Sequence, residues 1–95
     1  MNVIEKNKFI GLIFDKVFDC VCIQSDRYCE EEDIVPPTPD DADAFDRYCD
    51  YLNNVTAAAV TEIIHKYGDM TCKEAIEALD NETIDEFIDL DSAQF

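Results

Sequence analysis

Apolar residues recur three and four positions apart along the first quarter of the chain, which is the period of an amphipathic helix. Lys8, Asp15 and Asp19 fall on the opposite side of the same helical wheel. We therefore predict a helix over residues 3–24 with one wide apolar face. Leu12 and Ile23 fall on its polar side, where single exposed apolar residues are common. The predicted apolar face consists of Val3, Ile10, Ile13, Phe14, Val17, Phe18 and Val21.

A segment rich in acids and prolines follows this helix. Residues 30–33 are four consecutive acids, and Pro36 and Pro37 fix an extended backbone and disfavour helix before them. We predict that residues 25–38 form a Pro-rich acidic linker. A short hairpin within residues 23–35 is the alternative, because apolar pairs bracket a polar stretch there.

A second and longer helical pattern begins after the linker. Thr38 is a suitable N-cap residue, and Pro39 is suited to the first helical position. Apolar residues then recur at helical spacing as far as Tyr67, and Gly68 is a stop signal. The pattern predicts a helix over residues 39–67, the longest element of the fold.

Two short helices are predicted in the remaining residues. Thr71 and Glu74 match a capping box, which predicts a helix over residues 72–79. Asp80 and Asn81 interrupt the pattern, and residues 82–90 are predicted to form the last helix. The chain is therefore expected to be a single all-α domain over residues 1–95, a small bundle of about four helices. The predicted inward residues of the two short helices are Ala75, Ile76, Leu79, Ile84, Phe87 and Ile88.

The charge of the chain is large and unevenly distributed. Its 95 residues include 23 Asp and Glu against seven Lys and Arg, a formal net charge of −16. Residues 1–29 hold equal numbers of acids and bases, so the whole excess lies after them. Binding to nucleic acid or to an anionic membrane is excluded, because both require clustered Lys and Arg. A magnitude of about 2–8 is sufficient to keep a small domain soluble, so the surplus indicates a function.

Targeting signals and cysteine spacing indicate the compartment. Asp15 ends the apolar run that begins at Phe9. The run is too short for a secretory signal or a membrane helix. The five cysteines are an odd set without disulfide-rich spacing. We expect a soluble protein of the host cell cytoplasm.

Catalytic and metal-binding patterns are weak. His65 is the only histidine, and it falls near the polar edge of the long predicted helix. A Zn²⁺ site from Cys20, Cys22, Cys29 and His65 is disfavoured, because the first two thiols point to different sides of a helix. Residues 40–46 lack the Gly and Glu positions of an EF-hand loop. We expect no enzymatic activity, no metal site and no cofactor.

The surplus carboxylates are the remaining candidate for a function. Asp40, Asp43, Asp46 and Asp50 fall on one arc of the long predicted helix and span about 15 Å of rise. A DNA strand places a phosphate roughly every 3.4 Å along its axis, hence about four over that length. The acids could therefore imitate phosphates. The predicted partner-binding residues are Glu30, Glu31, Glu32, Asp33, Asp40, Asp43, Asp46, Asp50, Tyr51, Asp85, Glu86 and Asp89.

Residues 40–52 also resemble an acidic helical stretch in a phage anti-CRISPR protein that acts as a DNA mimic. The shared pattern is Asp-Asp-Ala-Asp followed by Tyr-x-Asp-aromatic-Leu. Size and charge are similar to the wider class of phage-encoded DNA mimics, which inhibit CRISPR effectors or restriction enzymes. The known relative has a mixed α/β fold, whereas this chain is expected to be helical. The resemblance implies that Asp40, Asp43, Asp46 and Asp50 face a basic DNA channel of a host enzyme.

Two other functions remain open at this point. An immunity or antitoxin-like module would cap a toxin through an aromatic patch, with Tyr51 on the polar arc and Tyr28 in the linker as anchors. A homodimer would instead bury Leu12 and Ile23 between two copies of the chain.

Overall fold

The computed structural model describes residues 1–92, which form four α-helices and one 3₁₀ turn. No β-strand occurs within these residues, so the predicted all-α bundle is confirmed and the alternative hairpin is wrong. The elements are α1 (Val3–Glu31), α2 (Ala42–Tyr67), α3 (Cys72–Ala78), α4 (Asn81–Phe87) and the 3₁₀ turn η1 (Leu90–Ser92).

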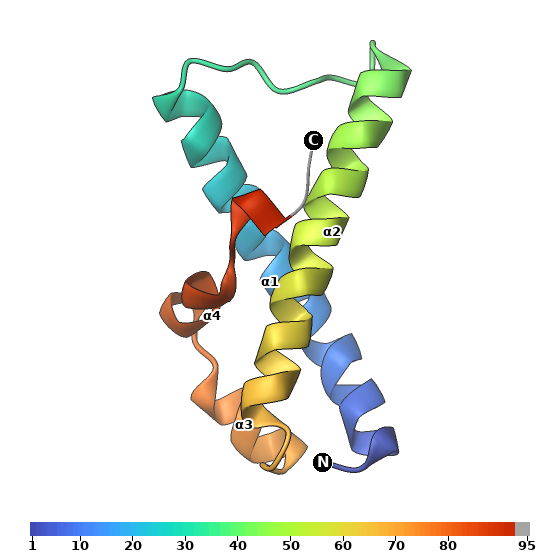
Figure 1. Ribbon diagram of the computed structural model, residues 1–95, viewed down its shortest axis with the longest axis vertical. Helices are drawn as coiled ribbons and strands as arrows, with labels where there is room; N and C mark the ends of the chain where they lie inside the picture. Colours follow the sequence, from blue (N-terminus) through green and yellow to red (C-terminus); the bar gives the residue numbers. More distant parts are fainter. Residues whose placement is uncertain (93–95) are drawn as a thin grey trace.

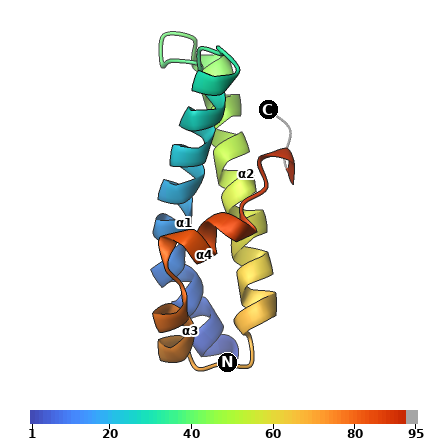
Figure 2. The same cartoon turned by 90° about the vertical axis from the view of Figure 1, so that its left-hand side faces the viewer.

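The long helices α1 and α2 run in opposite directions and cross near their middles (Figure 1). The short helices α3 and α4 lie across one face of this pair, as Figure 2 shows. The molecule measures 42 × 24 × 17 Å, with its long dimension along the two long helices. The connection between α1 and α2 lies at one end of the molecule, and α3 lies at the other (Figure 1).

The core lies between α1 and α2 and under α3 and α4. Lys16 on α1 donates from Nζ to the carbonyl oxygen of Leu79 at 3.1 Å, which attaches α1 to the end of α3. The rings of Tyr67 and Phe87, with centroids 6.3 Å apart, link α2 to α4. The most deeply buried side chains are Phe9, Val17, Val21, Val55, Thr56, Ile63, Ala75 and Ile84.

Helix α1 is longer than predicted, and it includes residues that we assigned to the linker. It continues through Tyr28 to Glu31 and ends in a Schellman motif, with Asp33 in the left-handed region at φ 56°. The backbone N–H of Ile34 donates to the carbonyl of Cys29 at 2.8 Å, and that of Asp33 donates to Glu30 at 3.4 Å. The prolines were expected to end the helix earlier, but this turn separates them from it.

Helix α2 begins three residues later than predicted. The backbone N–H of Asp41 donates to the carbonyl of Thr38 at 3.0 Å, so Pro39 and Asp40 lie in a turn. Asp41 is the N-cap, and its carboxylate accepts from the backbone N–H of Ala44 at 3.3 Å. Thr38 is therefore not the cap, because an acid three residues further on takes this role.

Helix α3 has the predicted cap, whereas the cap and the end of α4 were not predicted. The Thr71 hydroxyl accepts from the backbone N–H of Glu74 at 3.2 Å, which confirms this half of the capping box. Asp80 caps α4 by accepting from the backbone N–H of Thr83 at 2.8 Å. Helix α4 ends at Phe87 and not at residue 90, because Ile88 turns to an extended backbone.

Burial departs from the predicted faces at several positions, of which three are the clearest. Val3 and Ile76 were expected to be inward, but 74% and 37% of their surfaces are exposed. Phe9 was not assigned to the inner face, yet it is completely buried. Leu12 and Ile23 are exposed, as their place on the wheel predicts.

Candidate partner-binding surface

The end of α1 and the start of α2 lie at the same end of the molecule, which we call the acidic end; the two helices diverge there and the connection spans the gap between them (Figure 1). Residues 26–50, which form this end, hold ten Asp and Glu and only two Arg. Every carboxylate predicted to bind a partner in residues 30–50 is exposed. The fold therefore places two acidic segments, which the prolines separate in the sequence, at the same end of the molecule.

The acidic row on α2 is shorter than predicted. Asp43, Asp46 and Asp50 are spaced three and four residues apart on the helix and are all exposed. They span about 10 Å at 1.5 Å per residue. Asp40 precedes the helix, in the turn before the N-cap, so it extends the row without being part of the helical arc.

A hollow with acidic walls lies beside the end of α1. Asp26, Glu30 and Asp33 line it together with Ile34 and Pro36, and its volume is about 480 Å³. Asp33 reaches this position because of its left-handed backbone, a conformation that Asp and Asn tolerate better than most residues. Negative charges at the C-terminal end of a helix interact unfavourably with the helix dipole. The last turn of α1 contains no base that would offset this interaction.

A second, apolar hollow of about 170 Å³ lies between α1, the connection and α2. Tyr28, Ile34 and Val35 border it and expose 49%, 47% and 86% of their surfaces. Tyr48 and Tyr51 form its α2 side, with ring centroids 6.3 Å apart. Our sequence reasoning did not identify this hollow. The sequence feature that could have indicated it is the apolar pair Ile34 and Val35, which lies between the acids of residues 30–33 and two prolines.

The two tyrosines that we proposed as anchors lie in different surroundings from those predicted. Tyr28 belongs to α1 and not to a linker, and about half of it is exposed. Tyr51 is half-buried and not on an outer arc, and its hydroxyl donates to the carbonyl of Leu90 at 2.7 Å. Tyr51 therefore attaches the chain after α4 to α2, while its ring borders the apolar hollow.

The remaining predicted acids lie elsewhere. Asp85 and Glu86 are exposed on α4, which crosses the helix pair about halfway along the molecule (Figure 2). The backbone carbonyl of Asp85 accepts from the side-chain amide of Gln24 at 3.4 Å, so this part of α4 lies beside α1. Asp89 is exposed between α4 and η1. The structure thus places residues 30–33 and 40–50 at the same end of the molecule and these three acids elsewhere.

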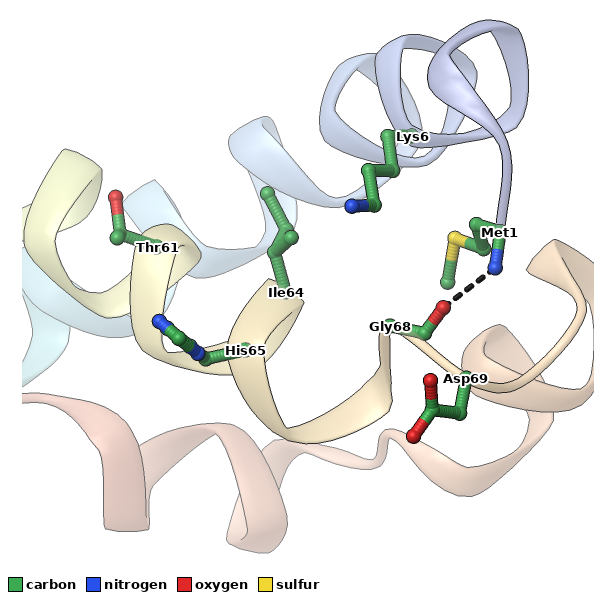
Figure 3. A pocket seen from close by; sticks show the side chains of 7 residues that line it. All are labelled: Met1, Lys6, Thr61, Ile64, His65, Gly68 and Asp69. Atoms are coloured by element: carbon green, nitrogen blue, oxygen red, sulfur yellow. Dashed lines mark hydrogen bonds between the residues drawn. The ribbon is translucent and has the colours of Figure 1, made fainter.

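Bases gather at the end opposite the acidic end. Lys6 and Lys8 lie near the start of α1, Lys66 lies at the end of α2, and Lys73 lies on α3. Figure 3 shows a hollow at this end, where the terminal amine of Met1 donates to the carbonyl of Gly68.

The same hollow contains the single histidine. The His65 ring is exposed, and Figure 3 shows it lying apart from the carboxylate of Asp69. Asp69 is the acid that lines this hollow together with His65, and because their side chains lie apart the hollow does not pair an acid with the imidazole.

The cysteines have the environment of packing residues. Burial, followed by the charge of Asp85, raises the pKa of Cys20, and burial followed by Asp26 raises the pKa of Cys22. These thiols are therefore held in the less reactive protonated form. All five cysteines are free. Within residues 1–92, no group of three or more His, Cys, Asp or Glu is placed to hold a metal ion.

No helix within residues 1–92 combines the length and the apolar character needed to cross a bilayer. No protein-family model, curated protein or solved structure matches the chain.

Proposed function

We propose that the chain is an inhibitor that imitates nucleic acid and occupies the basic groove of a host CRISPR effector or defence nuclease, so that DNA or RNA cannot enter. The observation that supports this proposal is that residues 30–33 and 40–50 lie at the same end of the molecule, with their carboxylates exposed. The local resemblance of residues 40–52 to a phage DNA mimic points to the same class of partner.

Rigid placement of the carboxylates is what the proposed mechanism requires. Those on α1 and α2 project from long helices that a common core holds together, so their spacing is set before binding. A groove that binds phosphates presents Lys and Arg at comparable spacing, and opposite charges accelerate the encounter of two proteins. Binding then excludes nucleic acid by occupying the same basic side chains.

Competition with DNA tests this proposal. Purified CRISPR effectors and restriction nucleases are incubated with a labelled DNA duplex and increasing amounts of the chain, and the bound duplex is measured. We expect the duplex to be displaced from one of them. The affinity of the chain for that enzyme should fall steeply between about 50 and 200 mM salt, as phosphate contacts do.

A matched pair of variants assigns the effect to the acidic end. The triple variant Asp43→Asn, Asp46→Asn and Asp50→Asn should lose at least about tenfold in affinity, since several phosphate-like contacts are removed together. The control Glu62→Gln, Asp69→Asn and Glu77→Gln removes the same charge from the far half of the molecule and should change affinity less than about threefold. Equal losses for both variants, or a flat salt dependence, would contradict mimicry.

A second candidate function is favoured by the exposed Tyr28, Ile34 and Val35. A protein that caps a toxin through an aromatic patch would depend on these residues, with charge assisting. Tyr28→Ala separates the two functions better than Tyr51→Ala, because the Tyr51 hydroxyl also holds the chain after α4. A loss above about 2 kcal/mol in binding would indicate an aromatic hot spot, and a near-neutral result would indicate distributed charge.

A further inference from the structure

The apolar hollow and the acidic hollow at the end of α1 share a wall. Cys29, Ile34 and Pro36 line both of them. On one side of this wall lie the rings of the apolar hollow, and on the other side lie the carboxylates of Asp26, Glu30 and Asp33. The apolar hollow and the acidic hollow, which attracts cations, are therefore neighbours that only this wall separates.

We infer that these two hollows form one recognition site for a segment of the partner protein in which an aromatic or large aliphatic side chain is adjacent to Arg or Lys. The inference rests on the proposed function, and it specifies which side chains of the partner's basic groove would enter the two hollows. A cavity of about 150 Å³ holds a benzene-sized group, and the apolar hollow has about 170 Å³. It therefore has room for one such side chain.

Charge complementarity determines which residue of the partner should be adjacent to that apolar side chain. Asp26 and Glu30 are one helical turn apart on α1, and Asp33 follows the end of the helix. A guanidinium matches carboxylates with two parallel hydrogen bonds, and an ammonium is attracted as a point charge. Grooves that bind single strands combine Arg and Lys with aromatic side chains on which bases stack. The partner of a nucleic-acid mimic therefore carries both required groups side by side.

Other occupants are disfavoured by the same charges. An acidic segment would be repelled by the ten carboxylates of residues 26–50. A second copy of the chain carries a net charge of −16 and would be repelled as a whole.

The chain contains no tryptophan, which permits a direct test with a fluorescent probe. The probe is the synthetic peptide Arg-Arg-Trp-Arg-Arg with blocked ends, and its control is Arg-Arg-Ser-Arg-Arg, which has equal charge. Both are titrated into the full chain at low salt, with Trp emission and amide NMR shifts as readouts. We expect the Trp peptide to bind about tenfold tighter than the Ser peptide, because it buries a large apolar side chain. Its emission should shift to the blue, and shifted amides should cluster at residues 25–35 and 48–51.

Variants at exposed positions assign the binding without endangering the fold. Val35→Ser removes an apolar wall, and Val3→Ser makes the same change at the far end of the molecule. Val35→Ser should reduce the preference for the Trp peptide to less than about threefold, whereas Val3→Ser should leave it unchanged. Asp33→Asn keeps a residue that tolerates the left-handed backbone, and it should weaken both peptides about equally.

Three results would overturn the inference. The two peptides could bind equally, the amide shifts could fall on other residues, or light scattering could show that two copies of the chain cover the hollow. None of these results would affect displacement of DNA from a nuclease, which is the separate test of the proposed function. Conversely, a Trp preference that Val35→Ser abolishes would remain if no nuclease were inhibited, so the two failures are distinguishable.

Discussion

The hydroxyl of Ser25 on α1 lies 2.8 Å from the hydroxyl of Tyr48 on α2, and the two share a hydrogen bond. Ser25 is buried, and both residues line the apolar hollow. Ser25 is six residues before the end of α1 at Glu31, and Tyr48 is six residues after the start of α2 at Ala42. The bond therefore joins the two long helices near the ends that the connection links, and it helps to hold the crossing from which both acidic segments extend.

Breaking this bond should loosen the acidic end. Ser25→Ala and Tyr48→Phe each leave one hydroxyl without its partner in this bond, and each should lower the free energy of unfolding by about 1 kcal/mol. The double variant should lose less than the sum, with a coupling of about 0.5–1 kcal/mol measured by urea unfolding. Tyr28→Phe removes a more exposed hydroxyl and is the control, with a change within about 0.5 kcal/mol. Strict additivity would show that the bond does not couple the helices.

Phe9 should be among the most sensitive positions of the core. Its side chain is completely buried, so Phe9→Ala should lower the free energy of unfolding by about 3–5 kcal/mol. Val3→Ala is the control at a residue that the wheel placed inward and the structure exposes, and it should change stability by less than about 0.5 kcal/mol. Thermal unfolding monitored by circular dichroism measures both. Comparable losses for the two variants would contradict the described packing.

These two positions explain what sequence periodicity predicts and what it misses. A wheel assigns one inner face to a whole helix, and for α2 it identifies the centre of that face, since Leu52, Val55, Ala59, Ile63 and Tyr67 are all buried. Thr56 and Val60 are buried as well and make the face wider than the predicted stripe. Helix α1 contacts α2, α3 and α4 along different turns, so its buried face changes along its length. The number and type of helices follow from local patterns, while the burial of Phe9 depends on long-range packing.

The candidate surface, like the fold, could be predicted from the sequence only in part. The acidic segments are evident in the sequence, and their exposure follows from charge. Their separation at the acidic end depends on how α1 crosses α2, which no local pattern specifies. The end of α1 was missed because an Asp in the left-handed region has no strong sequence signal, whereas Gly at this position would have been recognised.

Asp33→Gly should therefore stabilise the fold. Glycine adopts the left-handed backbone without the strain of a side chain, and it removes an acid from the C-terminal end of α1. We expect the free energy of unfolding to rise by about 0.5–1 kcal/mol. Asp33→Asn removes the charge alone and should give a smaller gain, which separates the two contributions. A loss of stability with Gly would show that the carboxylate supports the turn.

Alkaline pH should destabilise the fold. Burial raises the pKa of Tyr48 and Tyr51 above the ordinary value of 10.0, and for Tyr51 the charge of Asp91 adds to the effect. Burial likewise raises the pKa of Cys20 and Cys22 above 9.0. The folded chain holds these protons more tightly than the unfolded chain, so the stability they contribute is complete below about pH 9. It is lost as the pH rises through the raised values.

Urea unfolding between about pH 8 and 11 measures this loss. Tyr48→Phe removes one of the shifted groups, so its stability should fall less steeply with pH than that of the parent chain. Val3→Ala changes an exposed residue that does not titrate, and its profile should follow that of the parent. Stability that increased over this range would contradict the burial of the two tyrosines.

Salt should affect the fold and the proposed binding in opposite directions. A net charge of −16 on 95 residues repels itself, most strongly at the acidic end, and sodium chloride screens this repulsion. We expect about 1 kcal/mol of stabilisation between low salt and roughly 0.5 M, equivalent to about 4–8 °C in Tm for a domain of this size. The same screening should weaken the interaction with a basic groove.

The variant with Asp43, Asp46 and Asp50 changed to Asn should respond less in both measurements. Sodium chloride is preferred to sulfate, which stabilises proteins through exclusion from their surface. A fold whose stability is independent of chloride would mean that the carboxylates are too well separated to repel one another, and so too sparse to imitate a line of phosphates.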